Sequence, residues 1–189
     1  MVPGGFLTSN QGETPMSRVY VTSDWHIGHK GIASRFRTTF GSDEHHDYTI
    51  IENAGRILKK RDTVLMLGDM AFSREGLSMI GKLPGRKILV RGNHDIFQTE
   101  DYVEIFDQIH GAYRYKGAFF THIPIHPTEM FRGFNVHGHS HRGGPREKQE
   151  GDMWWRYYNA ILEYNDYQIV PIEKVYEVLL ESEKEYESE

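Results

Sequence analysis

The sequence predicts an α/β fold, and three features of the chain indicate it. Short apolar runs rich in β-branched and aromatic residues alternate with segments of helical periodicity over residues 18–90. After them the chain changes to short strands separated by tight turns. Its 189 residues, 38% of them hydrophobic, suit one compact domain with one core. We therefore expect a parallel sheet connected by helices, followed by a second half that is rich in strands.

Three buried strands are expected in the first half of the chain. They are RVYVTSD at residues 18–24, TVLML at 63–67 and KILV at 87–90, and each leads into a polar cluster. The order strand, helix, strand, helix, strand implies parallel pairing through right-handed crossovers. In an open α/β sheet, ligands bind outside the carboxyl ends of such strands.

The segments between these strands show the helical spacing of apolar residues. It covers residues 48–60 and, in a shorter helix, residues 73–83, for which Ser73 is the expected N-cap. The dipeptide Pro84–Gly85 would end the second helix. A last helix is expected at the C-terminus, with Pro171 at its first position and an acidic end, ESEKEYESE, that frays.

The second half of the chain is expected to form short strands. The segments concerned are AYRYKGAFFTH, GFNVHGH and WWRYYNAILEYNDYQIVPI, and Asn165–Asp166 is the expected hairpin turn between two of them. The last segment contains an aromatic run of Trp154, Trp155, Tyr157 and Tyr158. Alternating core packing is the favoured interpretation of this run, and base stacking is the alternative.

Composition excludes several kinds of site. The chain has no cysteine, which excludes disulfides, thiolate metal sites and cysteine nucleophiles, and fits an intracellular, cytoplasmic protein. A formal net charge of −5 argues against binding nucleic acid through the bulk field of the protein. It does not exclude a nuclease, because bound metal ions supply local positive charge.

The N-terminal segment, residues 1–15, is rich in Gly, Pro, Ser, Thr and Asn. We expect a flexible extension or a leader introduced for expression, ahead of a single domain over residues 16–189 that ends in an acidic helix and tail. The first ten residues lack the basic start and the long apolar core of a signal peptide. No apolar run is long enough for a membrane span, so no membrane partner is expected.

Five of the predicted strands end in Asp, Asn or His. These side chains are Asp24, His26 and His29 after the first strand, Asp69 after the second, Asn93, His94 and Asp95 after the third, His122 after a later one, and His137, His139 and His141 after another. Any one of them alone is best interpreted as a turn, cap or surface residue. Their repetition in order, each at a strand end, instead favours one shared site.

Oxygen and imidazole ligands suit borderline to hard divalent ions, such as manganese, iron, zinc or nickel. Seven side chains are candidate ligands: Asp24, His26, Asp69, Asn93, His122, His139 and His141. Seven is too many for one tetrahedral zinc ion. The number fits two metals that share one bridging carboxylate and keep open positions for water and substrate.

The motifs SDWHIGHKGI, DTVLMLGD, RGNHD, TH before IP, and VHGHSH occur in this order in the chain. In this it resembles the calcineurin-like metallophosphoesterase superfamily, and particularly its small bacterial and phage members. The resemblance covers residues 18–172 and implies a four-layer α-β-β-α sandwich of two mixed β-sheets flanked by helices. It also implies that the protein is a metal-dependent phosphoesterase.

The resemblance further implies a division of the ligands. Asp24, His26 and His141 would hold the first metal ion, Asn93, His122 and His139 the second, and Asp69 would bridge them. Every ligand of the family's pattern is present, which argues against a relative that has lost catalysis. Manganese is the expected metal at both positions, with iron, zinc and nickel as alternatives.

The implied reaction is direct attack on phosphorus by hydroxide formed from a water between the two cations, which also offset charge on the phosphoryl group. His94 follows a ligand directly and is the expected general acid for the leaving group. Asp95 would hold the His94 imidazole in its productive tautomer, or would cap a following helix.

Other residues are weaker candidates. His29, Arg35 and Arg37 are predicted substrate contacts, in which the arginines would clamp a phosphate. Arginines on an exposed loop more often have no specific partner. His126 and His137 flank ligand positions, and with Asn159 they are expected to lie behind the ligands at most.

The substrate is left open by the sequence. A small or nucleotide-like phosphodiester or monoester is expected, with the diester favoured. A nuclease of the same fold acting on DNA or RNA, and a metal-stabilised binding module without turnover, are the alternatives. A protein phosphatase is less favoured, because the chain is short and lacks long substrate-groove insertions. The oligomeric state does not follow from the sequence.

Overall fold

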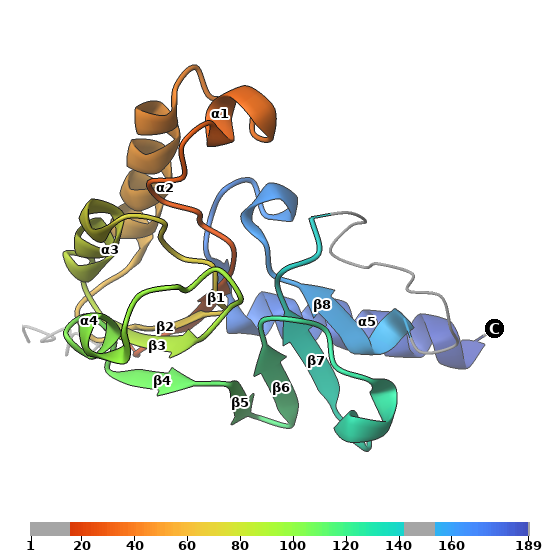
Figure 1. Ribbon diagram of the computed structural model, residues 1–189. Coiled ribbons are helices and arrows are strands. Elements are labelled where there is room, and N and C mark those ends of the chain that lie inside the picture. Colours follow the sequence, from red (N-terminus) through yellow and green to blue (C-terminus); the bar gives the residue numbers. More distant parts are fainter. Residues whose placement is uncertain (1–15, 142–153, 189) are drawn as a thin grey trace, which may run out of the picture.

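A computed structural model describes residues 16–141 and 154–188 and contains two mixed sheets with helices beside them (Figure 1). The first sheet has the order β4-β3-β2-β1-β9, in which β9 alone is antiparallel to its neighbour. Its strands are β1 (Val19–Thr22), β2 (Thr63–Met66), β3 (Arg86–Val90), β4 (Gln108–His110) and β9 (Val170–Pro171). The three predicted strands and their parallel pairing are therefore confirmed.

The second sheet has the order β5-β6-β7-β8. Strand β5 is antiparallel to β6, and the other pairs are parallel. Its strands are β5 (Ala112–Tyr115), β6 (Ala118–Thr121), β7 (Phe134–His137) and β8 (Tyr157–Asn159). The short strands expected in the second half of the chain thus form a sheet of their own.

Five α-helices and three short 3₁₀ helices occur in the described residues. They are α1 (Ile32–Arg35), α2 (Asp43–Ile57), α3 (Arg74–Gly81), α4 (Thr99–Val103) and α5 (Ile172–Ser188), with η1 (Pro127–Met130), η2 (Trp154–Arg156) and η3 (Leu162–Tyr164). Ser73 caps α3 as predicted, because its side chain accepts a hydrogen bond from Gly76 N. Helix α2 begins earlier than expected, at a cap formed by Ser42.

Side chains that alternate along the central strands belong to two separate hydrophobic cores, one on each face of the first sheet. Val64 and Met66 of β2 pack with α2 and α3 in the first core. Leu65 and Leu67 face the second core, with Phe120 of β6 and apolar residues of α5. Successive side chains of a strand point to opposite faces, and burying each one stabilises the fold by roughly 1.5–3 kcal/mol. The second core therefore contains residues of both sheets.

Figure 1 shows the resulting layers. Helices α2 and α3 lie beside the sheet of β1 to β4, and α5 passes behind β7 and β8 of the second sheet. This arrangement confirms the predicted α/β sandwich of two mixed sheets flanked by helices. Residues 1–15, for which an N-terminal extension was predicted, lie outside the described residues. No described helix combines the length and the apolar character needed to cross a membrane.

The predicted hairpin at Asn165–Asp166 is wrong. Strands β8 and β9 belong to different sheets, so the chain crosses between the sheets here instead of turning back on itself. The side chain of Asn165 donates to the carbonyl of Ile161 (2.8 Å) and accepts from the Tyr158 hydroxyl (2.8 Å). These bonds hold a compact loop after η3 that delivers the chain to the edge of the first sheet.

Two details of the C-terminal helix also differ from the prediction. Pro171 is the last residue of β9, paired with Tyr20, and the helix begins one residue later. The acidic end does not fray over the described residues, since α5 continues to Ser188. Tyr186 in its last turns stacks on Trp155, with ring centroids 5.4 Å apart, and this packing holds the end of the helix in place.

Candidate metal centre

The predicted ligands come together where strands of both sheets end. Asp24 and His26 follow β1, Asp69 follows β2, and Asn93 follows β3 of the first sheet. From the second sheet, β6 leads to His122, and β7 leads into the loop that carries the last two histidines. The loop after β1 is joined to the loop after β2 by hydrogen bonds from the backbone N–H groups of Asp24 and His26. The two sheets therefore build one site between them.

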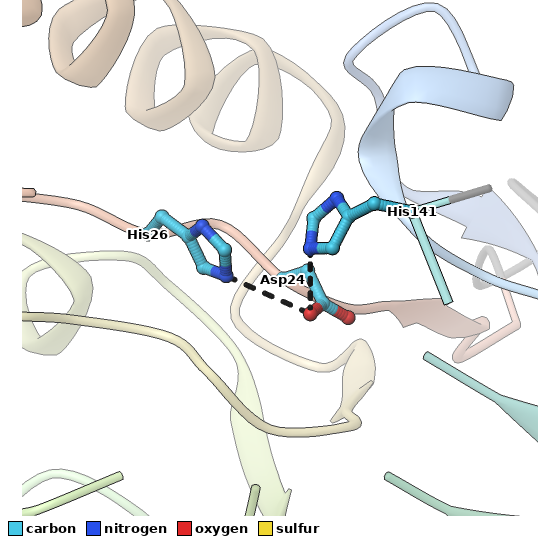
Figure 2. A group of neighbouring side chains, drawn as sticks. All are labelled: Asp24, His26 and His141. Atoms are coloured by element: carbon cyan, nitrogen blue, oxygen red, sulfur yellow. Dashed lines mark ion pairs between the residues drawn. The ribbon is translucent and has the colours of Figure 1, made fainter. Parts of the chain in front are cut away.

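The first group consists of Asp24, His26 and His141. Figure 2 shows both imidazoles directed at one carboxylate oxygen of Asp24. His141 Nε2 lies 3.3 Å and His26 Nε2 lies 3.6 Å from Asp24 Oδ1. The other oxygen, Oδ2, accepts a hydrogen bond from the backbone N–H of His139 (2.9 Å), which fixes the carboxylate with Oδ1 facing the imidazoles.

The second group is built around His122. Its Nε2 atom lies 2.8 Å from Asn93 Oδ1, 3.2 Å from His139 Nδ1 and 3.5 Å from Asp69 Oδ2. Ligand atoms of Asp69, His122 and His139 lie within 4.8 Å of one another, as do those of the first group. Each group thus offers converging nitrogen and oxygen atoms at the spacing that one metal ion needs.

Asp69 lies between the two groups. Its Oδ2 atom is 3.5 Å from His122 Nε2 in the second group and 3.8 Å from His26 Nε2 in the first. Its Oδ1 atom accepts a hydrogen bond from the backbone N–H of His94 (2.8 Å). As in Asp24, a backbone donor holds one oxygen and leaves the other facing imidazoles of the site.

The residues present fit divalent cations. Asp24 Oδ1 and His26 Nε2 are buried without a hydrogen-bond partner among the described residues, which is rare because each such group costs about 1–3 kcal/mol. His122 Nδ1 donates to the carbonyl of Leu67 (2.7 Å), so its Nε2 faces the amide oxygen of Asn93 as a second acceptor. Acceptors that face one another are stabilised by a cation between them, and this donor set suits divalent metals.

Four of the predicted ligands have a left-handed backbone conformation. The φ angles are 57° for Asp24, 55° for His26, 55° for Asp69 and 66° for His139. For residues other than glycine this conformation costs of the order of 1 kcal/mol or more and needs support from the surrounding structure. Strained backbone conformations are common at functional sites, and here they occur at residues whose side chains converge on the candidate metal positions.

Two glycines let the turns after β2 and β3 touch. A Cβ on Gly92 would lie 2.7 Å from the backbone nitrogen of Asp69 and 2.9 Å from His122 Cε1. Gly68 has a φ of 90°, and a Cβ there would lie 2.5 Å from Gly92 N. The carboxylate of Asp95 joins the turns by accepting from Gly92 N (2.7 Å) and Asp69 N (3.0 Å).

The charges of the first group shift pKa values in a way that favours a bound cation. Burial alone would raise the pKa of Asp24, but contacts with His141 and His26 hold it far below its usual range. Contacts with Asp24 and Glu163 raise the pKa of His141 to about 9. Burial lowers the pKa of His26, yet Asp24 and Asp69 raise it overall. Without metal, protons on imidazoles balance the carboxylates, and metal binding would displace them.

Comparison with known proteins identifies the family. A sequence model described as calcineurin-like phosphoesterase matches residues 17–179. The chain belongs to this family. The resemblance of its motifs is thereby confirmed, and the protein is a metal-dependent phosphoesterase whose two candidate metal sites are the groups described above.

Individual relatives of the phosphoesterase cover parts of the chain. The uncharacterized protein MJ1445 of Methanocaldococcus jannaschii is 28% identical over 67% of this chain and 70% of its own length. The gene 66 protein of Mycobacterium phage L5 is 41% identical over 42% of this chain and 41% of its own length. A crystal structure of AQ665, a protein of unknown function from Aquifex aeolicus, matches with a TM-score of 0.65 and 28% identity over 86% of this chain and all of that chain. The last likeness supports the predicted fold class.

Arg37 of the phosphoesterase does not face the substrate side, contrary to the prediction. Its side chain is buried, and its guanidinium donates to the backbone carbonyls of Asp24 (2.6 Å) and Trp25 (3.0 Å). It also pairs with both carboxylate oxygens of Glu163, each at 3.0 Å. Arg37 therefore holds the loop that carries Asp24 in place. Its N–H groups already donate to protein acceptors, so they do not face a substrate phosphate.

Glu163 is a residue of the centre that sequence reasoning missed. Its Oε1 atom lies 3.0 Å from His141 Nδ1, so the carboxylate fixes the imidazole with Nε2 directed at Asp24. Burial would raise the pKa of Glu163, but His141 and Arg37 lower it to about 2, so the carboxylate stays charged. No motif marks this glutamate, which follows the apolar run AIL in the C-terminal part of the chain.

The substitution Glu163→Gln tests this support of the first group. Glutamine keeps an acceptor for His141 but loses the charge that binds Arg37, so we expect metal affinity at one of two sites to fall about tenfold. Calorimetric titration of metal-free protein with Mn²⁺ would resolve the weakened site. Glu187→Gln, at an exposed position of α5, is the matched control. Two unchanged affinities in Glu163→Gln would show that the carboxylate does not support His141.

Asp95 and His94 were predicted to act together, and the structure gives Asp95 a different position. Its carboxylate binds backbone N–H groups of the adjoining turns, as described above, rather than the His94 ring. It is not a helix cap either, because α4 begins at Thr99 with Gln98 as its N-cap. His94 itself is exposed at the rim, with its ring 5.4 Å from that of Phe72.

The remaining candidates fall into two sets. His29 and Arg35 line a pocket beside the first group, where a substrate can reach them. His126 is exposed and bonds to a neighbouring threonine, whereas His137 is buried with its ring beside Tyr157. Asn159 donates to the backbone carbonyl of Ser140, next to two ligand histidines.

The aromatic run of the C-terminal segment is buried at its two tyrosines and half-buried at its two tryptophans. Tyr157 and Tyr158 are buried in β8, and Tyr158 joins the second core. Trp155 stacks on Tyr186 of α5. The two tyrosines support core packing, the favoured interpretation of the run, whereas Trp155 packs near the surface, because Tyr186 is 40% exposed.

Proposed function

We propose that this phosphoesterase hydrolyses phosphodiesters with two divalent metal ions, one held by Asp24, His26 and His141 and one by Asn93, His122 and His139. The position of Asp69 carries the proposal. Its Oδ2 atom lies within 4 Å of an imidazole nitrogen of each group, which supports a bridging role. Manganese is the proposed metal, because oxygen and imidazole ligands are mixed in both groups.

Bound metal ions would activate water for attack at neutral pH and offset negative charge on the phosphoryl group. The protein's own contribution is to fix the ligand atoms before metal arrives. Backbone N–H groups hold the outer oxygens of Asp24 and Asp69. The Leu67 carbonyl and the Glu163 carboxylate hold the Nδ1 atoms of His122 and His141, which leaves each Nε2 for a metal.

His94 is proposed to protonate the leaving group. Its backbone N–H donates to Asp69, so the residue is anchored to the centre, while its side chain is exposed at the pocket that His26 and His141 also line. In the proposed reaction the leaving group departs toward this pocket, where the His94 side chain would give it a proton. The role does not need Asp95, whose carboxylate is engaged elsewhere.

The pocket favours a diester over a monoester. The arginine that lines it is Arg35, and the carboxylate that lines it is Glu163, which is already bound by Arg37. A phosphate monoester carries a second negative charge, for which a further cationic clamp would be expected. With Arg37 buried, the described pocket lacks one.

Initial rates on two aryl esters test the proposal. Mn²⁺-loaded protein would be assayed with bis-p-nitrophenyl phosphate and with p-nitrophenyl phosphate, before and after removal of metal with a chelator. We expect faster cleavage of the diester, lost on chelation and restored by Mn²⁺. Faster cleavage of the monoester would indicate a phosphatase. No turnover of either ester by metal-loaded protein would favour a binding module.

A further inference from the structure

A pocket of about 490 Å³ opens beside the first group of ligands. His26, His94 and His141 form its polar part, next to which the phosphoryl group lies in the proposed reaction. Phe36 and Phe72 contribute aromatic surface to the same pocket. Its volume lies within the range of roughly 300–1,000 Å³ that is typical of small-molecule sites. A group attached to the phosphate can therefore enter it.

Phe72 is the centre of the aromatic surface. Its ring centroid lies 4.8 Å from that of His29, 5.2 Å from His26 and 5.4 Å from His94. Phe36 lies 6.1 Å from His29 and is 69% exposed. A large aromatic side chain exposed beside a cluster of rings offers a face on which a flat ring can stack. The surface therefore favours a planar aromatic group.

His29 adds another flat ring to this surface. It lines the same pocket, and its imidazole is edge-to-face with Phe72, at 72° between the ring planes. Arg35 at the end of α1 lines the same pocket and adds a positive charge. A stacking surface and a cation beside the metal ligands together fit a nucleotide.

We propose that this pocket seats the nucleobase of a nucleotide-type phosphodiester against Phe72 and Phe36. The inference rests on the proposed function, because a phosphoryl group at the metal ligands places the attached nucleoside next to Phe72. Stacking accepts any base, since every base has a flat π face. The substrate class is then cyclic nucleotides, dinucleotides or the ends of short oligonucleotides rather than esters of aliphatic alcohols.

Two ligands that differ only in the base test the pocket. Calorimetry on Mn²⁺-loaded protein would compare AMP with ribose 5-phosphate, and phosphate release in the same samples would report any turnover. We expect AMP to bind at least about tenfold more tightly. Phe36→Ala and Phe72→Leu should reduce that ratio while the affinity for ribose 5-phosphate is kept. Tyr48→Ala removes an aromatic ring that is 62% exposed on α2, and should leave the ratio unchanged.

The outcomes separate the pocket from the reaction. Equal affinities for AMP and ribose 5-phosphate, or a ratio that both phenylalanine variants leave unchanged, would overturn the base-binding pocket even if bis-p-nitrophenyl phosphate is hydrolysed. Tighter binding of AMP that depends on Phe36 supports the pocket. If such a protein hydrolyses neither aryl ester, the pocket stands and the proposed reaction fails.

Discussion

Asp69→Asn is expected to lower phosphodiester turnover by about a thousandfold or more, because it removes a charged oxygen that faces both ligand groups. Asparagine has nearly the same shape, and its carbonyl oxygen can still accept from His94 N, so the turn should persist. The side-chain amide of asparagine is neutral, so it cannot bridge two cations as a negatively charged carboxylate does. We expect the metal content to fall from two ions per chain to one or fewer.

The measurements are metal content after gel filtration, calorimetric titration with Mn²⁺, and turnover of bis-p-nitrophenyl phosphate. Asp166→Asn is a matched control, because Asp166 is exposed and also has a left-handed backbone, with a φ of 51° against 55° for Asp69. Thermal unfolding without metal would show whether either variant is folded. A folded Asp69→Asn protein with two ions and normal turnover would reject the bridging role.

The sequence predicts which of these side chains lie near one another, because local patterns determine most of their positions. A buried strand followed by Asp24, Asp69 or Asn93 is visible in one segment at a time, and parallel pairing brings such segments to one edge. The left-handed backbone conformation of the ligands is harder to predict from the sequence, because here it occurs at aspartate and histidine and no glycine marks the position. The predicted ligands lie together because each depends on its own strand end.

Contacts between distant segments could not be predicted in this way. Arg37 and Glu163 are 126 residues apart, and neither lies in a periodic pattern that indicates its partner. A single arginine on a loop is usually exposed, so burial of Arg37 follows only from the packed structure. The hairpin expected at Asn165–Asp166 failed for the same reason, because turn residues do not reveal which sheet the next strand joins.

His94→Ala is expected to keep both metal ions and to lose about a hundredfold or more in turnover of diesters with a basic leaving group. The side chain is exposed, so its removal should leave the fold intact. A proton donor matters most when the departing oxygen is strongly basic, and little when it is a stable phenolate. The loss should therefore be large for a dinucleoside phosphate, which releases an alkoxide, and small for bis-p-nitrophenyl phosphate.

This dependence on the leaving group distinguishes proton donation from a positioning role of His94. Removal of a group that only positions substrate would lower both rates by a similar factor, because both diesters place the same phosphoryl group at the metals. His45→Ala is the control for general effects of losing a histidine, because it removes an exposed imidazole elsewhere in the protein, on α2. Equal losses on the two diesters would assign His94 to binding, and no loss on the dinucleoside phosphate would exclude it as the acid.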